Sequence, residues 1–150
     1  MLNIIKQFLD HHFAPLAPHL SSEEQLRVAS VALFLEMIEM DDKGEAKERD
    51  LILSLVQKSF SLTAEQAEAL IAMAEQDRKQ ATDYFQYTSL INKLCSLEQK
   101  IQLIESLWRI ALVDGQLDPE EEYLVRKLAE LLYVPHVDFI MTKIRVNHNL

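Results

Sequence analysis

Glycine and proline are scarce in this chain of 150 residues, which has only 2 Gly and 4 Pro. An all-β domain needs many tight turns, and such turns depend on these two residue types. Their scarcity excludes a β sandwich or barrel and favours helices. The composition is 49% hydrophobic, which is enough for one core, and the length fits one domain. The sequence therefore predicts a compact all-α domain.

Cysteine is nearly absent as well. Because Cys95 is the single cysteine of the chain, no intramolecular disulfide and no thiolate zinc site can form. This usage indicates a reducing compartment. The neighbours of Cys95 are apolar, so we expect the thiol to pack rather than to react.

Basic residues are outnumbered by acidic ones, with 15 Lys and Arg against 24 Asp and Glu and a net charge of -9. This charge repels phosphate backbones and excludes nucleic acid as a partner. It is compatible with a basic protein surface or a bound cation. The partner we expect is another protein, which the sequence does not identify.

The chain also lacks a long apolar run, because no segment approaches the roughly 18 consecutive apolar residues of a membrane-spanning helix. The N-terminal stretch MLNIIKQFLDHHF is short, contains Asp10 and lacks the small-residue cleavage site of a signal peptide. We expect a soluble, cytoplasmic protein.

An apolar stripe at helical spacing predicts an amphipathic helix over residues 2–13, formed by Leu2, Ile5, Phe8 and Leu9. Its face could rest on a membrane, but only Lys6 supplies the basic flank that such helices carry. Docking on protein is therefore the favoured interpretation. We divide the chain into residues 1–20 (this helix and a Pro-containing turn), 21–146 (a single all-α domain) and 147–150 (a frayed tail).

Helix-start signals organise the domain. Ser21 with Glu24 forms a capping box, Thr63 with Gln66 starts another helix, and Ser96 opens a third. Apolar periodicity predicts further helices, with expected ends near Met40, Phe60, Arg78, Val113 and Tyr133. Residues 79–90 are the least regular section, and a short helix is expected just after them. A last helix carries Val137 to Ile144.

The most informative stretch is the helix–turn–helix corner Asp114-Gly115-Gln116-Leu117-Asp118-Pro119-Glu120-Glu121. It carries acids at its first, fifth and eighth positions, which are Asp114, Asp118 and Glu121. The same positions recur 73 residues earlier as Asp41, Glu45 and Glu48. Apolar residues match at this offset too. We therefore predict a bundle of about seven helices with an internal pseudo-twofold repeat.

Part of this pattern has a purely structural explanation. Asp118 is a good N-cap, Pro119 suits the first helical position, and Glu121 completes a capping box near the positive end of the helix dipole. Gly115 can adopt the left-handed conformation that ends the preceding helix. On this interpretation the acids are only helix caps.

Asp41 and Asp114 fit that explanation less well. Each follows the C-terminal end of a helix, where a negative charge opposes the dipole by roughly 0.3–1 kcal/mol. Carboxylates gathered around tight corners can instead hold a hard divalent cation, with calcium or magnesium favoured by the all-carboxylate ligands. The predicted metal ligands are Asp41, Glu45, Glu48, Asp114, Asp118 and Glu121. The corner is not an EF-hand, because Gln116 and Val125 occupy its third and twelfth positions.

The segment LWRIALVDGQLDPEEEYLVRKLAELLYV, residues 107–134, resembles the tellurite-resistance TerB-like family. The family signature is an Asp-Gly corner followed by a Glu that opens the next helix. The resemblance extends over roughly residues 25–145, and it implies a seven-helix bundle that is cytoplasmic and non-enzymatic, with clustered acids suggested to bind metal. Asp114 and Glu121 match the second corner of the family, and Asp41 and Glu48 match the first. The first corner departs from the pattern, with Asp42 in place of the Gly.

Three functional hypotheses follow. The first is a TerB-like module that acts as a stress-linked scaffold or sensor through another protein, with a divalent cation at the two corners. The second is a structural or adaptor domain whose acids are only helix caps. The third and weakest is a metal-dependent hydrolase, because paired carboxylates can do acid–base work but no nucleophile or phosphate-binding motif accompanies them.

Overall fold

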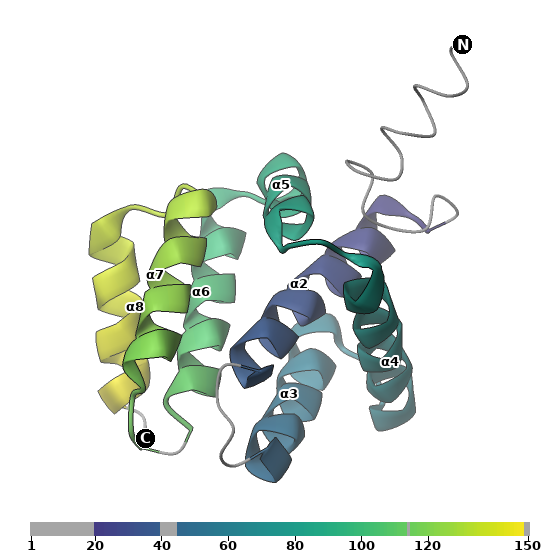
Figure 1. Cartoon of the computed structure of the whole chain (residues 1–150), viewed down its shortest axis with the longest axis horizontal. Coiled ribbons are helices and arrows are strands. Elements are labelled where there is room, and N and C mark those ends of the chain that lie inside the picture. Colours follow the sequence, from purple (N-terminus) through teal and green to yellow (C-terminus); the bar gives the residue numbers. More distant parts are fainter. Residues whose placement is uncertain (1–19, 40–44, 114, 149–150) are drawn as a thin grey trace.

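A computed structural model describes residues 20–39, 45–113 and 115–148, and in these residues the chain forms only helices. The helices keep the labels of Figure 1 and have the following bounds: α2 (Ser22–Glu39), α3 (Glu45–Phe60), α4 (Ala64–Gln80), α5 (Phe85–Leu94), α6 (Leu97–Ala111), α7 (Pro119–Leu131) and α8 (His136–His148). The predicted all-α bundle of seven helices is confirmed. The amphipathic helix predicted over residues 2–13 lies outside the described residues.

Helix α2 is the central element. Most of its residues from Val28 to Ile38 are buried, so it is apolar on nearly all sides, as expected of a helix enclosed by others. It contacts α3, α4, α5 and α6. Figure 1 shows it running obliquely through the middle of the molecule. The core of the domain is therefore built around one helix.

The described helices pack as two sets of three that α5 connects along the chain. Helices α2, α3 and α4 contact one another, and so do α6, α7 and α8. The two sets meet where α2 and α3 touch α6. This arrangement is compatible with the offset of 73 residues between the corners, but the internal repeat itself stays a prediction.

Trp108 joins α6 to α8 in the second set. Its side chain is fully buried, its Nε1–H donates to the carbonyl oxygen of Phe139 over 3.2 Å, and the two rings lie 5.1 Å apart. A buried indole needs such an acceptor for its N–H. Trp108 is therefore a core residue of this set.

Most predicted helix starts are confirmed. Thr63 with Gln66 and Ser96 with Gln99 form complete capping boxes. At the start of α2, the amide of Glu24 donates to the Ser21 hydroxyl over 3.1 Å, and that hydroxyl donates to the Glu24 carboxylate. Helix α5 begins at Phe85, earlier than expected, and its N-cap Tyr84 makes no side-chain cap. The Asp83 carboxylate instead accepts a hydrogen bond from the amide of Phe85 over 2.8 Å.

Two helices end on residues with positive φ. Ser61 follows α3 with φ 54 and Tyr133 follows α7 with φ 57. In both places the next amide reaches back five residues, from Leu62 to the carbonyl of Gln57 and from Val134 to that of Ala129. This is the Schellman arrangement, which favours glycine at the left-handed residue. Because Ser61 and Tyr133 carry a Cβ atom, the backbone is strained at each of these helix ends.

We expect Ser61→Gly to stabilise the protein by about 0.5–1 kcal/mol, because glycine adopts the left-handed conformation without a Cβ clash. Ser61 is exposed, so no packing is lost. Urea unfolding measures the change, with Ser61→Val as the matched control that should destabilise. A destabilising Ser61→Gly would contradict the strain assigned to this position.

Candidate functional site

The helix ends that border the two acidic corners lie on the same side of the molecule. Figure 1 shows the C-terminal ends of α2 and α6 and the N-terminal ends of α3 and α7 at its lower side. Asp41 and Asp114 lie outside the described residues. Glu45 and Glu48 lie in the first turn of α3, and their side chains also lie outside the description. Asp118 and Glu121 are therefore the predicted ligands whose side chains the structure describes.

Gly115 turns the chain after α6. Its φ of 78 is left-handed, and its amide donates to the carbonyl of Leu112 over 3.0 Å. A Cβ at this position would meet nothing within 4 Å, so the backbone conformation and not space calls for glycine. The predicted conformation of Gly115 is confirmed.

Asp118 caps helix α7, as predicted. Its carboxylate accepts a hydrogen bond from the amide of Glu120 over 3.3 Å, and Pro119 occupies the start of the helix. This hydrogen bond goes to the amide two residues on, whereas the predicted capping box involves the amide of Glu121. Glu120, Glu121 and Glu122 all lie in the first turn, where their charge is favourable to the dipole.

Glu121 is buried, with only 2% of its surface exposed. A buried carboxylate is costly unless it is compensated by polar neighbours or positive charge, and the amino end of α7 supplies part of this compensation. A simple surface cap would not require such burial. Of the two predicted ligands whose side chains are described, Glu121 is thus the one that is buried beside a corner.

Within residues 20–39, 45–113 and 115–148, no group of three or more His, Cys, Asp or Glu side chains is placed to hold a metal ion. Since only Asp118 and Glu121 of the six predicted ligands have described side chains, this finding does not test the corners. The divalent-cation site stays a prediction.

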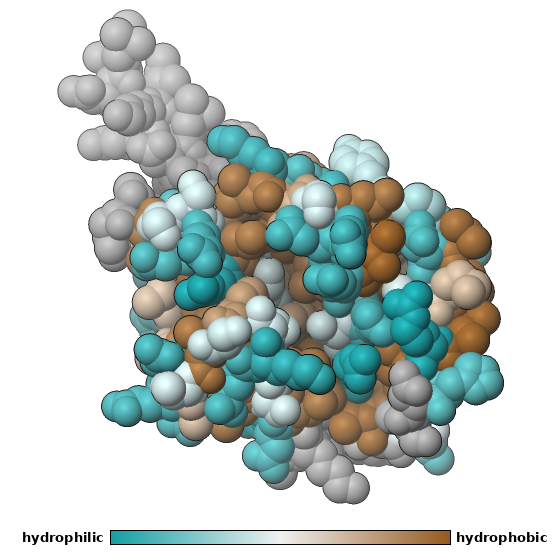
Figure 2. All heavy atoms as spheres, turned by 180° about the vertical axis from the view of Figure 1, so that it is seen from behind, coloured by the Kyte–Doolittle hydropathy of each residue, from teal (hydrophilic) through white to brown (hydrophobic). Residues whose placement is uncertain are grey.

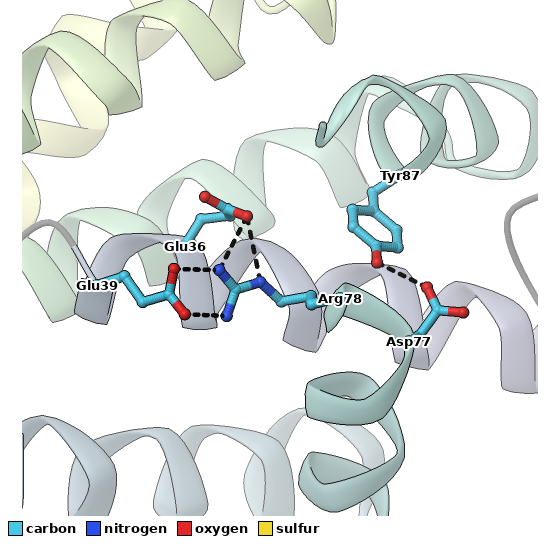
Figure 3. Close-up of polar contacts among 5 residues, drawn as sticks. All are labelled: Glu36, Glu39, Asp77, Arg78 and Tyr87. Carbon is cyan, nitrogen blue, oxygen red and sulfur yellow. Dashed lines mark hydrogen bonds and ion pairs between the residues drawn. The ribbon is translucent and has the colours of Figure 1, made fainter. Parts of the chain in front are cut away.

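A polar network missed by the sequence analysis lies between α2 and α4 (Figure 3). Arg78 donates to both oxygens of Glu39, over 2.9 and 2.6 Å, and twice to Glu36, over 3.1 and 3.0 Å. Only 12% of its side chain is exposed. Burial acts to lower the pKa of Arg78, and the contacts with Glu39 and Glu36 outweigh it, so the pKa rises. The guanidinium stays charged and ties the two helices together.

The neighbouring residue of α4 forms a second buried contact. The Tyr87 hydroxyl donates to the Asp77 carboxylate over 2.6 Å, and Tyr87 is fully buried. Burial raises the pKa of Tyr87, and Asp77 raises it further. Burial also raises the pKa of Asp77, although the hydrogen bond from Tyr87 lowers it. This pair anchors α5 to α4.

A groove of about 450 Å³ lies between α2, the end of α3 and α6, and Phe60, Cys95 and Leu103 contribute to its lining. Arg27 crosses it, paired with Glu23 over 2.8 Å and stacked over the Phe60 ring at 5.5 Å. Burial raises the pKa of the Cys95 thiol, although Lys100 acts to lower it. This disfavours the reactive thiolate, and Cys95 packs against the core as expected.

The fold and its corners define an all-α domain of two three-helix sets whose inter-helix turns carry acids. A family model described as "Tellurite resistance protein TerB" matches residues 27–144. The chain belongs to the TerB family, which confirms the resemblance seen in the sequence. Searches of curated proteins and of solved structures gave no match. No helix in the described residues has the length and hydrophobicity needed to cross a membrane.

We expect Arg78→Met to destabilise the protein by about 2 kcal/mol, because it leaves Glu36 and Glu39 without their buried counter-charge. Arg49→Met is the matched control. Arg49 pairs with Glu75 over 3.0 Å but is 59% exposed, so its loss should cost less than about 1 kcal/mol. Urea unfolding compares the two variants. Equal losses would show that the Arg78 network contributes no more than a surface ion pair.

The Asp77–Tyr87 pair predicts a pH dependence of stability. The pKa of Asp77 in the folded protein is raised above 3.8, so ionised Asp77 destabilises the folded state. This destabilisation is complete above the folded-state pKa and disappears as the pH falls from that pKa to 3.8. Asp77→Asn keeps an acceptor for Tyr87 and removes the charge. The Asp77→Asn variant should therefore gain most stability over the parent protein near neutral pH, and this gain should shrink as the pH falls.

Urea unfolding between about pH 7 and about pH 4 measures this difference. Tyr87→Phe is the matched control, because it removes the hydrogen bond that lowers the pKa of Asp77. The penalty of ionised Asp77 should then grow. A stability difference between Asp77→Asn and the parent that is constant over this range would contradict the raised pKa.

Proposed function

We propose that this TerB domain is a non-enzymatic module that binds a divalent cation at its two acidic corners and acts through another protein, as a stress-linked scaffold or sensor. One observation carries the proposal: the four helix ends that border the corners lie on the same side of the molecule (Figure 1). Helix ends of both corners are thereby brought to one end of the bundle. Carboxylate oxygens from more than one segment are what calcium or magnesium requires.

Glu121 supports the second corner in particular. It is buried, in the first turn of α7, and seven residues after Asp114. Binding a cation beside a buried carboxylate would offset the cost of keeping that charge out of water. A cation that links a loop acid to a helix acid would also hold the corner in one conformation. A partner protein could bind that conformation selectively.

The hydrogen bond from Glu120 to Asp118 favours a second candidate, an adaptor domain whose acids are only helix caps. In that case the corners stabilise α3 and α7, and the partner binds elsewhere. The two candidates differ in whether the charge of the corner acids matters, apart from their ability to accept hydrogen bonds.

The test is thermal unfolding of chelator-treated protein titrated with calcium, magnesium, manganese and zinc. An ion that binds only the folded state stabilises it by about 2.7 kcal/mol at one hundred times its dissociation constant. We expect one of the hard ions to raise the melting temperature, and Asp41→Asn and Asp114→Asn to reduce or abolish the shift. Glu98→Gln is the control, since Glu98 lies in the first turn of α6 at the opposite end of that helix.

Asp118→Asn separates the cap from the ligand. Asparagine caps helices as well as aspartate does, so the variant should keep its stability without ions but lose ion-dependent stabilisation. Asp118→Ala should cost about 1 kcal/mol even in chelator. If no ion raises the melting temperature of the parent protein, the corners are helix caps and the adaptor candidate holds.

A further inference from the structure

The outer face of α8 carries an exposed apolar stripe. Val137, Met141 and Ile144 are 64%, 51% and 44% exposed, and Tyr133 just before the helix is 76% exposed. The opposite face holds the buried residues of the helix, Phe139, Thr142 and Val146. Figure 1 places α8 at the edge of the molecule, and Figure 2 shows hydrophobic side chains gathered along the same edge.

Spacing makes this stripe different from scattered surface hydrophobics. Positions 137, 141 and 144 follow one another by four and three residues, so they align on one side of a helix. Single exposed apolar residues are ordinary on protein surfaces, but a continuous row of them marks an interaction site. The α8 stripe, defined as Tyr133, Val137, Met141 and Ile144, therefore fits another helix.

The charges beside the stripe indicate which helix. Asp138 and Arg145 are seven residues apart, so they lie along the same flank of the stripe, two turns from each other. If a second α8 packs antiparallel about a twofold axis at Met141, this flank of one molecule lies against the same flank of the other, and the two flanks run in opposite directions. Asp138 then lies opposite Arg145 of the second copy, and Arg145 opposite Asp138. Val137 and Ile144 meet in the same reciprocal way.

Both charges can take part. Asp138 makes no ion pair within the described part of the chain. Arg145 contacts Glu105 over 3.5 Å through one nitrogen, but its side chain is 53% exposed, and a guanidinium has five N–H groups to donate. The flank is therefore self-complementary.

We propose that the α8 stripe is the interface of an antiparallel homodimer, centred on Met141 and bordered by two reciprocal Asp138–Arg145 ion pairs. The charge of α8 supports a second copy as the occupant. The chain carries a net charge of -9, whereas residues 136–148 contain one acid and two bases. Two acidic molecules meet there with less repulsion than elsewhere.

A lipid surface fits the same face less well. Interfacial helices use free lysines and arginines to bind anionic lipids. In α8, Lys143 is held by Glu122 over 3.6 Å and lies 5.4 Å above the Trp108 ring, and Arg145 contacts Glu105. Lys143 is thus already paired, and the half-exposed Arg145 by itself is too little positive charge to attract anionic lipids.

Sedimentation equilibrium of the full chain tests the dimer. A single helix stripe is smaller than a standard interface, so we expect a dissociation constant between about 10 µM and about 1 mM. Met141→Glu should make the protein monomeric over this range, because it places two like charges at the twofold axis. Met73→Glu is the matched control, as Met73 is an equally exposed methionine on α4, and it should leave association unchanged.

Charge reversal tests the antiparallel register. Asp138→Arg places Arg opposite Arg, and Arg145→Asp places Asp opposite Asp, so each variant alone should associate at least tenfold more weakly than the parent. Mixing the two variants creates two opposite-charge pairs in the heterodimer and should restore association to within about threefold of the parent. Thermal unfolding checks that both variants fold.

Three outcomes would overturn the proposal. One is a parent protein that stays monomeric at about 1 mM. Another is a dimer that Met141→Glu leaves intact. The third is a mixture of charge variants that associates no better than either variant alone. Flotation with vesicles of neutral and anionic lipids gives an independent check, since binding that Met141→Glu abolishes would assign the stripe to a membrane surface instead.

Discussion

The burial of α2 is the constraint on which the rest of the structure depends. Its side chains from Val28 to Ile38 are largely enclosed by α3, α4, α5 and α6, and it holds more buried residues than any other described helix. Because nearly every side of α2 is apolar, the hydrophobic effect requires other helices on each of them. The two three-helix sets are the result. Their packing brings the helix ends that border both corners to one end of the molecule and leaves the outer face of α8 without a described neighbour.

Polar contacts then fix how the helices lie around this core. Arg78 joins α4 to α2 through Glu36 and Glu39, and the buried Tyr87–Asp77 pair joins α5 to α4. Such contacts add directional preference to a hydrophobic core that would otherwise tolerate sliding of one helix along another.

The fold class, the TerB family and most helix starts could be predicted from the sequence because they rest on local signals. Thr63 with Gln66, Ser96, and Asp118 with Pro119 are caps whose partners lie within three residues. The start of α5 at Phe85 was missed because its N-cap residue, Tyr84, is not a capping type, and the carboxylate that binds the first helical amide belongs to Asp83, one residue earlier. The Arg78 network was missed because its partners are 39 and 42 residues away, a separation at which sequence spacing carries no information. Of the predicted ligands, the N-cap role of Asp118 follows from its sequence, whereas the burial of Glu121 depends on tertiary packing.

The central place of α2 has a consequence for how the chain emerges from the ribosome. Helix α2 is made first among the described helices, yet two of the helices that enclose it, α5 and α6, come from residues 85–111. A nascent chain that ends before residue 85 therefore exposes part of the most buried of the described helices to solvent. Synthesis proceeds at about 5–20 residues per second, so this exposure lasts for seconds, long enough for a chaperone to bind. The helix that organises the finished domain is thus the segment most in need of protection during its synthesis.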